Sequence, residues 1–277
     1  MSAPKLTMLL ACFSAAGVLM AAANYQSEIA AWRQKRDAGL RRDGGWLTVA
    51  GLFWLREGAN RFGTNAANEI VLPNGPAQAG VFELHHGKVT ALVNGSTREM
   101  KPDTEELVPV GRLRLYVIQR GERFAIRMKD PDSQYLREFH GLEYFPAREE
   151  YRVAARFVPE PRKIPIANIV GQTEMDDCPG YVEFQLHGRQ LRLYPVLEEP
   201  GANELFFIFR DETAGKETYG AGRFLYTDLP KDGSVVLDFN KAYNPPCAFT
   251  PYATCPLPPK ENRVAARIEA GEKKYGH

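Results

Sequence analysis

The chain has 277 residues, of which 44% are hydrophobic and 25% are charged, and its formal net charge is +1. These proportions are ordinary for a globular protein with room for one large or two small cores. No basic tract stands out, so nothing in the charge pattern points to nucleic acid or an anionic membrane as a partner.

Residues 1–23 predict a secretory signal peptide. A single cation, Lys5, precedes an apolar stretch that starts at Leu6 and ends in a run of alanines at Ala23. This order is typical of a cleaved signal, and the apolar stretch is short for a membrane span. We therefore expect cleavage after about Ala23, no stable membrane span in the mature protein, and a periplasmic or secreted location. A lipoprotein with lipidated Cys12 is the alternative, and an uncleaved anchor is a further one.

Residues 24–43 predict one amphipathic helix from Gln26 to Arg42. Ser27 is placed to cap its start, and Gly44-Gly45 is placed to stop it. Three apolar side chains lie near one stripe of this helix: Ile29, Trp32 and Leu40. The spacing predicts a helix that packs across the body of the protein.

Residues 44–130 predict a first β unit, because turns recur at short intervals between strand-like runs. Arg112 to Ile118 alternates charged and apolar residues, as a half-buried strand does. Four of these turns are Glu57-Gly58, Asn74-Gly75, His86-Gly87 and Asn94-Gly95. Such regular punctuation is typical of a β-sandwich or barrel.

Residues 131–277 predict a second β unit. Ser133 to His140 fits one or two helical turns, and Pro159 to Pro165 fits an edge crossing or a linker. Strand signals then follow at residues 181–186, 190–194, 205–209, 222–226 and 235–239. The fold class that we expect is mainly β: an N-terminal helix followed by two sandwich-like or barrel-like units.

Residues 222–227 and 234–240, which extend the last two of these strands, predict a hairpin closed by "DLPKDG". Alternation of side chains would then put Arg223, Asp238 and Asn240 on one face, with Arg223 and Asp238 as diagonal neighbours. This pair has two readings. It could be a brace for the loop that follows, or it could be the floor of a ligand-binding pocket.

In the second reading, Arg223 offers a planar fork to an anionic ligand. Three further residues could line the wall of such a pocket: Tyr219, Tyr243 and Asn244. The Pro-rich loop from Tyr243 to Cys255 is expected to fold over the same face. Its prolines restrict the backbone, so the loop is suited either to a binding site or to covering a sheet edge.

The mature chain would keep three cysteines, and Cys247 and Cys255 are the disulfide candidates. Their Cα atoms are then expected about 4.4–6.8 Å apart, with Cys178 as the free thiol. Buried unpaired thiols and a catalytic Cys247 assisted by a base such as His140 are the alternatives. A single loose pair of cysteines does not predict a metal site, so we expect none.

Several segments together resemble the bacterial and archaeal domain-of-unknown-function family 1684. The most specific are "DETAGKETYGAGRFL", "DFNKAYNPPCAF", "CPLPPKEN" and "AGEK". That family brings no established activity for any residue. "FGTNAANEIVLP" and "VNGS" resemble the forkhead-associated sandwich, but Gly63-Thr64 and the loop at residues 76–80 lack the groups that hold a phosphate there. Any shared architecture therefore does not imply phosphothreonine binding.

No nucleophile elbow, phosphate-binding loop or dinucleotide fingerprint is found in the sequence. We therefore expect no cofactor. Whether the protein is an enzyme stays open. The leading hypothesis is an exported, non-catalytic protein that binds a small or extended ligand. The alternative is a cell-envelope hydrolase that uses Cys247 or the region from Asp238 to Tyr243, and a purely structural role is also open.

Overall fold

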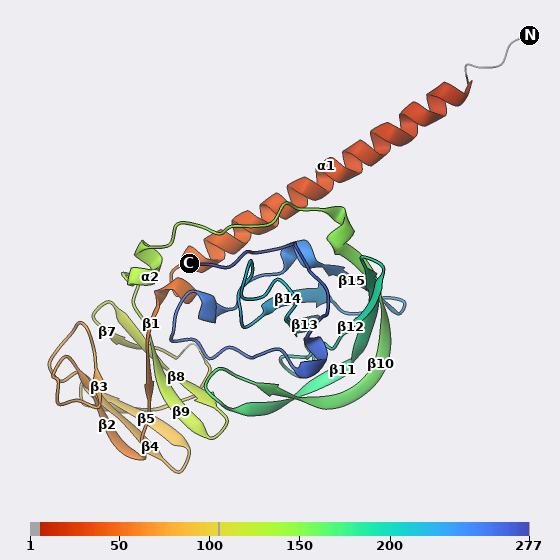
Figure 1. The fold of residues 1–277 in the computed structure, drawn as a ribbon. Helices are drawn as coiled ribbons and strands as arrows, with labels where there is room; N and C mark the ends of the chain where they lie inside the picture. The colour runs from red at the N-terminus through yellow and green to blue at the C-terminus, as the bar shows by residue number, and fades with distance from the viewer. Residues whose placement is uncertain (1–5, 105, 277) are drawn as a thin grey trace, which may run out of the picture.

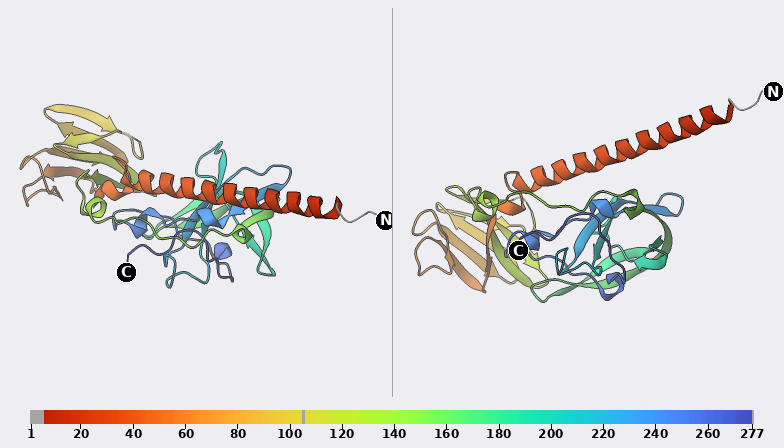
Figure 2. Two further views of the ribbon diagram at one scale, coloured as in Figure 1. Left: turned by 90° about the horizontal axis from the view of Figure 1, so that it is seen from above. Right: turned by 45° about the horizontal axis from the view of Figure 1, so that its top comes forward.

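The computed structural model describes residues 6–104 and 106–276. It is mainly β, with one long N-terminal helix, α1, over Leu6–Arg41 (Figure 1). The C-terminal half of α1 passes along the body, and its N-terminal turns extend beyond the sheets (Figure 2). Within the described residues, none of the helices combines the length and the hydrophobicity needed to cross a membrane.

The predicted apolar stripe of α1 faces the body, because Ile29 and Leu40 are each only 1% exposed. The predicted cap at Ser27 is wrong. Ser27 lies inside the helix, and its hydroxyl donates a hydrogen bond of 3.0 Å to the carbonyl of Ala23. The preceding residues are rich in alanine and leucine, which favour helix, so the helix continues upstream of the expected start.

The first β unit is a sandwich of two sheets, ordered β1-β9-β8-β7 and β3-β2-β4-β5-β6. One hydrophobic cluster joins them. Within it, Phe62 of β2 and Phe82 of β4 stack at 4.7 Å between ring centroids, both on the second of these sheets. The strands are β1 (Val49–Trp54), β2 (Gly58–Gly63), β3 (Ile70–Val71), β4 (Gly80–His85), β5 (Lys88–Val93), β6 (Ser96–Met100), β7 (Val108–Val110), β8 (Leu113–Arg120) and β9 (Arg123–Lys129). The predicted sandwich is thus present, and no barrel closes among the described strands.

The second β unit has a larger sheet, ordered β12-β11-β10-β15, and a separate pair, β13-β14. A short helix precedes it, α2 over Gln134–Arg137, and the hydroxyl of Ser133 caps its start. The strands are β10 (Arg152–Ala167), β11 (Thr173–Leu186), β12 (Arg189–Leu193), β13 (Glu204–Phe209), β14 (Arg223–Asp228) and β15 (Ser234–Asp238). Short 3-10 turns lie at Trp46–Thr48, Glu149–Tyr151, Phe239–Lys241, Pro246–Ala248 and Lys260–Asn262.

The linker reading of Pro159 to Pro165 is wrong, because these residues belong to the long strand β10. β15 pairs only with residues 152–156 of that strand, so the proline-containing part has β11 on one side alone. The register also shifts between Pro159 and Arg162. Proline is tolerated at such free edges and irregularities, because no ladder hydrogen bond needs its missing N–H.

The predicted hairpin of residues 222–227 and 234–240 is also wrong. Both strands exist, but β14 pairs with β13, and β15 pairs with β10. Leu225 and Leu237 belong to one hydrophobic cluster between the two sheets, so these strands face each other across the core. Consecutive strands pair in most cases but not in all, and here the connection crosses from one sheet to the other.

Candidate ligand-binding cleft

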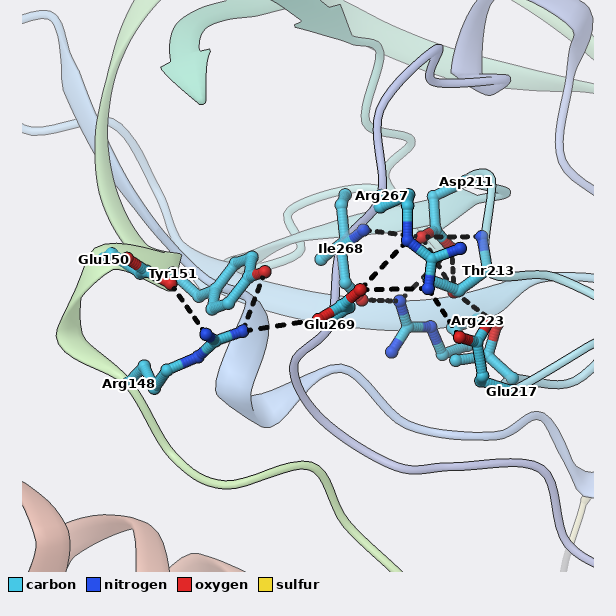
Figure 3. Close-up of polar contacts among 11 residues, drawn as sticks. Arg148, Glu150, Tyr151, Asp211, Thr213, Glu217, Arg223, Arg267, Ile268 and Glu269 are labelled. Carbon is cyan, nitrogen blue, oxygen red and sulfur yellow. Dashed lines mark hydrogen bonds and ion pairs between the residues drawn. The ribbon is translucent and has the colours of Figure 1, made fainter. Parts of the chain in front are cut away.

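Arg223 is a buried structural residue and not the floor of a pocket. It is 1% exposed and donates to the carboxylate of Asp211 at 3.2 Å and to the carbonyl of Ile268 at 2.9 Å. A further bond goes to the carbonyl of Ala270. Figure 3 shows the guanidinium between the Asp211 side chain and the C-terminal segment. The expected pair with Asp238 is wrong, and the guanidinium has no access to a ligand.

Arg223 lies on the face of β14 that points into the core, whereas that face was expected to carry the site. In β14, Arg223 pairs with Phe209 across the ladder, and Leu225 points into the same large core. The alternate residues Phe224 and Tyr226 belong to a different cluster on the other face. The alternation within each strand is as predicted, but β14 and β15 belong to different sheets, so the residues that share a face cannot be derived by pairing one strand with the other.

Asp238 and Asn240 anchor α1 to the body. The hydroxyl of Tyr25 donates to Asp238 at 2.8 Å, and the Asn240 side-chain amide donates to that hydroxyl at 2.7 Å. The Asn240 side chain also accepts a hydrogen bond from the backbone N–H of Arg148 and donates one to the carbonyl of Arg148. Burial is the largest cause that raises the pKa of Tyr25, and Asp238 adds to it. These bonds make Asn240, which is fully buried, a structural residue.

Asn244 and Glu272 tie the Pro-rich loop to the C-terminal segment. The backbone N–H of Asn244 donates to the Glu272 carboxylate at 2.8 Å, and the Asn244 side chain donates to the carbonyl of Lys273. Arg36 of α1 donates to the same carboxylate at 2.8 Å. Burial raises the pKa of Glu272, whereas Arg36 opposes this shift. The expected role of Asn244 as a pocket wall is therefore not what its contacts show.

The Pro-rich loop packs on the face opposite to Arg223, so its expected position is wrong as well. Tyr243 exchanges two backbone hydrogen bonds of 2.9 Å with Phe224, and the hydroxyl of Tyr219 donates to the carbonyl of Cys247. Cys247 and Cys255 form a disulfide with a Cα separation of 6.2 Å, inside the expected range. Cys178 is a buried free thiol, as predicted.

An aromatic floor lies beneath the loop on this second face. The rings of Phe206 and Tyr226 stack at 4.7 Å with 18° between their planes, and Tyr226 and Tyr243 lie at 6.3 Å and 14°. The outer side of this floor opens into adjoining pockets, two of which have volumes of about 410 and 330 Å³. Both pockets share Tyr226 and Tyr243, so we treat them as one cleft.

The walls of the cleft come from segments far apart in the sequence. Helix α1 gives one wall, the 3-10 turn that enters the sandwich and the end of β8 give another, and the Pro-rich loop closes the third. The residues that line the smaller pocket are Arg36, Trp46, Arg120, Glu198, Phe206, Phe224, Tyr226, Tyr243, Pro246, Thr254, Cys255 and Pro256. The larger pocket adds Glu28, Trp32, Arg152, Glu204, Thr227, Asp228, Val236, Asp238 and Lys241.

The floor is neutral and the walls carry charge. Burial raises the pKa of both Tyr226 and Tyr243, so these phenols remain protonated at physiological pH. The hydroxyl of Tyr226 donates to Glu198 at 2.6 Å. Arg36 lies over the ring of Tyr243 at 4.5 Å, which fixes the ring by a cation–π contact. The cleft thus offers flat apolar surface with a few polar groups, as small-molecule sites do.

Of the predicted site residues, the structure brings Asp238 and Tyr243 to the cleft. Tyr219 does not line either of the two pockets, and its hydroxyl is bonded to the backbone of the loop. Sequence reasoning missed Trp46, Phe206 and Tyr226 as lining residues. Phe206 and Tyr226 are register partners, and aromatic residues at such positions are a usable signal only once the partner strand is known. No local signal distinguishes Trp46 from a core residue.

Comparison with known proteins places the chain in an uncharacterised family. Residues 137–273 match the family described as a protein of unknown function, DUF1684. A solution structure of an uncharacterised protein from Haloarcula marismortui is 31% identical. That match covers 52% of this chain and 82% of the other, with a TM-score of 0.41. No curated protein matches. The chain belongs to the DUF1684 family.

Proposed function

We propose that this protein is a non-catalytic binding protein whose cleft takes a small or extended ligand with a flat ring. The observation that carries the proposal is the stack of Phe206, Tyr226 and Tyr243 at the base of an open cleft. Aromatic side chains give large contact areas and favour stacked or edge-on ring partners. A rigid frame of α1, sandwich and disulfide-bonded loop holds these rings in place before a ligand arrives.

The hydrolase alternative is weaker than the binding proposal. Such chemistry at Cys247 would need a thiolate, and the sulfur of Cys247 is bonded to Cys255. Asp238 is held by Tyr25 and Asn240 rather than placed beside a nucleophile. The favoured base, His140, is exposed. The contacts in this region therefore support a role in architecture.

Replacement of Tyr226 by leucine is expected to weaken binding of ring compounds, because it removes the middle ring of the floor. Stacking on one aromatic side chain is worth about 1–3 kcal/mol, so affinity should fall about 5-fold to 150-fold. Isothermal titration calorimetry with 2-naphthoate and with neutral 2-naphthylmethanol measures the dissociation constants of the wild-type protein and the variant. Tyr181→Leu is the matched control, because Tyr181 is a half-buried tyrosine of β11 that does not line the cleft. The proposal fails if neither compound binds, or if both variants bind alike.

We also propose that the protein is exported, on the pattern of Lys5, the apolar stretch and the alanines up to Ala23. Mature protein from the native host is expected to begin near Asn24. N-terminal sequencing or intact-mass measurement checks this. A mature chain that begins at Met1 or Ser2 would contradict export by cleavage, and a lipidated Cys12 would establish the lipoprotein alternative instead.

A further inference from the structure

Arg127 of β9 is a buried cation for which the described residues provide no anionic partner. It is 3% exposed, and its terminal nitrogen donates to the hydroxyl of Thr254 at 3.1 Å. Its Nε is buried and makes no hydrogen bond. The rings of Trp46 and Tyr116 lie 5.1 and 5.9 Å from the guanidinium carbon. Among the described residues, no carboxylate forms an ion pair with it.

A second arginine converges on the same hydroxyl. The Nε of Arg120 donates to Thr254 at 2.9 Å, and Arg120 also forms an ion pair of 2.9 Å with Asp103. One neutral hydroxyl accepts from both guanidinium groups and balances neither charge. Asp103 compensates Arg120, so the uncompensated charge is that of Arg127.

Arg120 and Thr254 lie at the edge of the aromatic floor, and Arg127 lies behind Thr254, outside the residues that line the pocket. Arg120, Thr254 and Trp46 line the pocket of about 330 Å³ whose base includes Phe206 and Tyr226. A buried charge without a partner is costly, and an oxyanion next to it would remove much of that cost. Guanidinium groups match carboxylate and phosphate oxygens with paired, charge-assisted hydrogen bonds. The position therefore suits the acidic group of a molecule whose ring lies on the floor.

The neighbouring acids restrict where such a group can lie. Glu174 and Asp176 line the adjoining pocket beyond Arg120, and Glu198 lines both that pocket and the smaller pocket of the cleft. Burial raises the pKa of Asp176, and the nearby acids add to this effect. These acids repel an anion, so it is directed to the end of the pocket at Trp46 and Thr254, which lies next to the charge of Arg127.

We propose that the ligand of this cleft is an acid, with its carboxylate or phosphate bound by Arg120 and Thr254, close to the buried charge of Arg127, and its ring against Tyr226 and Tyr243. The proposal rests on the proposed binding function and names the class of ligand. Arg127 then acts through Thr254, which it holds by a hydrogen bond, and the negative charge of the ligand offsets its own.

The test compares three compounds with one ring system: 2-naphthoate, 2-naphthyl phosphate and neutral 2-naphthylmethanol. Hydrogen bonds to charged groups contribute about 1.5–3 kcal/mol, so at least one anion should bind about tenfold or more tightly than the alcohol. Its affinity should also fall as salt rises. The stronger of the two anions shows whether the site prefers carboxylate or phosphate. Equal affinity of all three overturns the acid proposal and leaves ring binding intact, whereas no binding of any overturns both.

Two variants locate the anion. Arg127→Met and Arg120→Gln should each reduce the preference for the anion about tenfold while the alcohol binds as before. Arg127→Met should keep or raise the melting temperature of the free protein, because an apolar side chain replaces an uncompensated buried charge. Arg61→Gln is the control, since Arg61 pairs with Glu69 on the surface of the sandwich. A lower melting temperature of Arg127→Met with an unchanged preference would show a structural arginine and overturn the proposal.

Discussion

Replacement of Arg223 by alanine is expected to lower the free energy of unfolding by about 3–5 kcal/mol, as the loss of one partner of a buried ion pair does. The guanidinium and the Asp211 carboxylate are each about 1% exposed and lie 3.2 Å apart. Without Arg223, this carboxylate loses its cation, and the carbonyls of Ile268 and Ala270 lose their donor. Urea unfolding followed by circular dichroism measures the change.

Two further variants separate the causes of this loss. Arg223→Lys should lie between wild type and Arg223→Ala, because an ammonium keeps the charge but cannot span the carboxylate and two carbonyls. Arg61→Ala should change little, since its pair with Glu69 is on the surface. A similar loss in Arg223→Ala and Arg61→Ala would show that the buried network does not stabilise the fold.

The sequence segments that carried the family resemblance meet in this network. Asp211 and Arg223 belong to "DETAGKETYGAGRFL", Asn244 to the Pro-rich segment, and Glu272 to "AGEK". Glu272 accepts from Asn244 and from Arg36 of α1, while Arg223 holds the backbone just before it. These motifs therefore have an architectural explanation, because they fasten the C-terminal segment through the interior. Their specificity does not imply that they bind a ligand.

Local patterns predicted the elements well. The alternation in Arg112 to Ile118 predicted β8, and the apolar spacing of Ile29 and Leu40 predicted the buried side of α1. The stiff loop predicted that Cys247 and Cys255 come within reach of each other. Each of these inferences depends on residues close together in the chain, where periodicity and turn chemistry decide the structure.

The site was harder to predict because it depends on contacts between distant segments. Pairing β14 with β13 rather than β15 moved Arg223 into the core and Tyr226 to the cleft. Arg127 and Thr254 are 127 positions apart, and nothing in either strand or loop pattern predicts that they meet. One wrong strand partner was enough to place the candidate site on the wrong face of the sheet.

Replacement of Gly271 by alanine is expected to destabilise the protein by about 3 kcal/mol or more, because it combines backbone strain with a clash. Gly271 has a φ of +75°, and a Cβ there would lie 2.3 Å from the carbonyl oxygen of Ala242 and 2.8 Å from that of Phe239. Both oxygens are backbone atoms that cannot turn aside.

Gly87→Ala separates the two effects, because Gly87 has a similar φ of +77° but no atom within 4 Å of the position that a Cβ would take. It should lose only about 1 kcal/mol from backbone strain. Chemical denaturation of both variants gives the comparison. Equal losses would mean that the C-terminal segment does not pass as closely beneath the turn at Phe239–Lys241 as the structure shows, and the packing that fixes Glu272 against Arg36 would then have to be different.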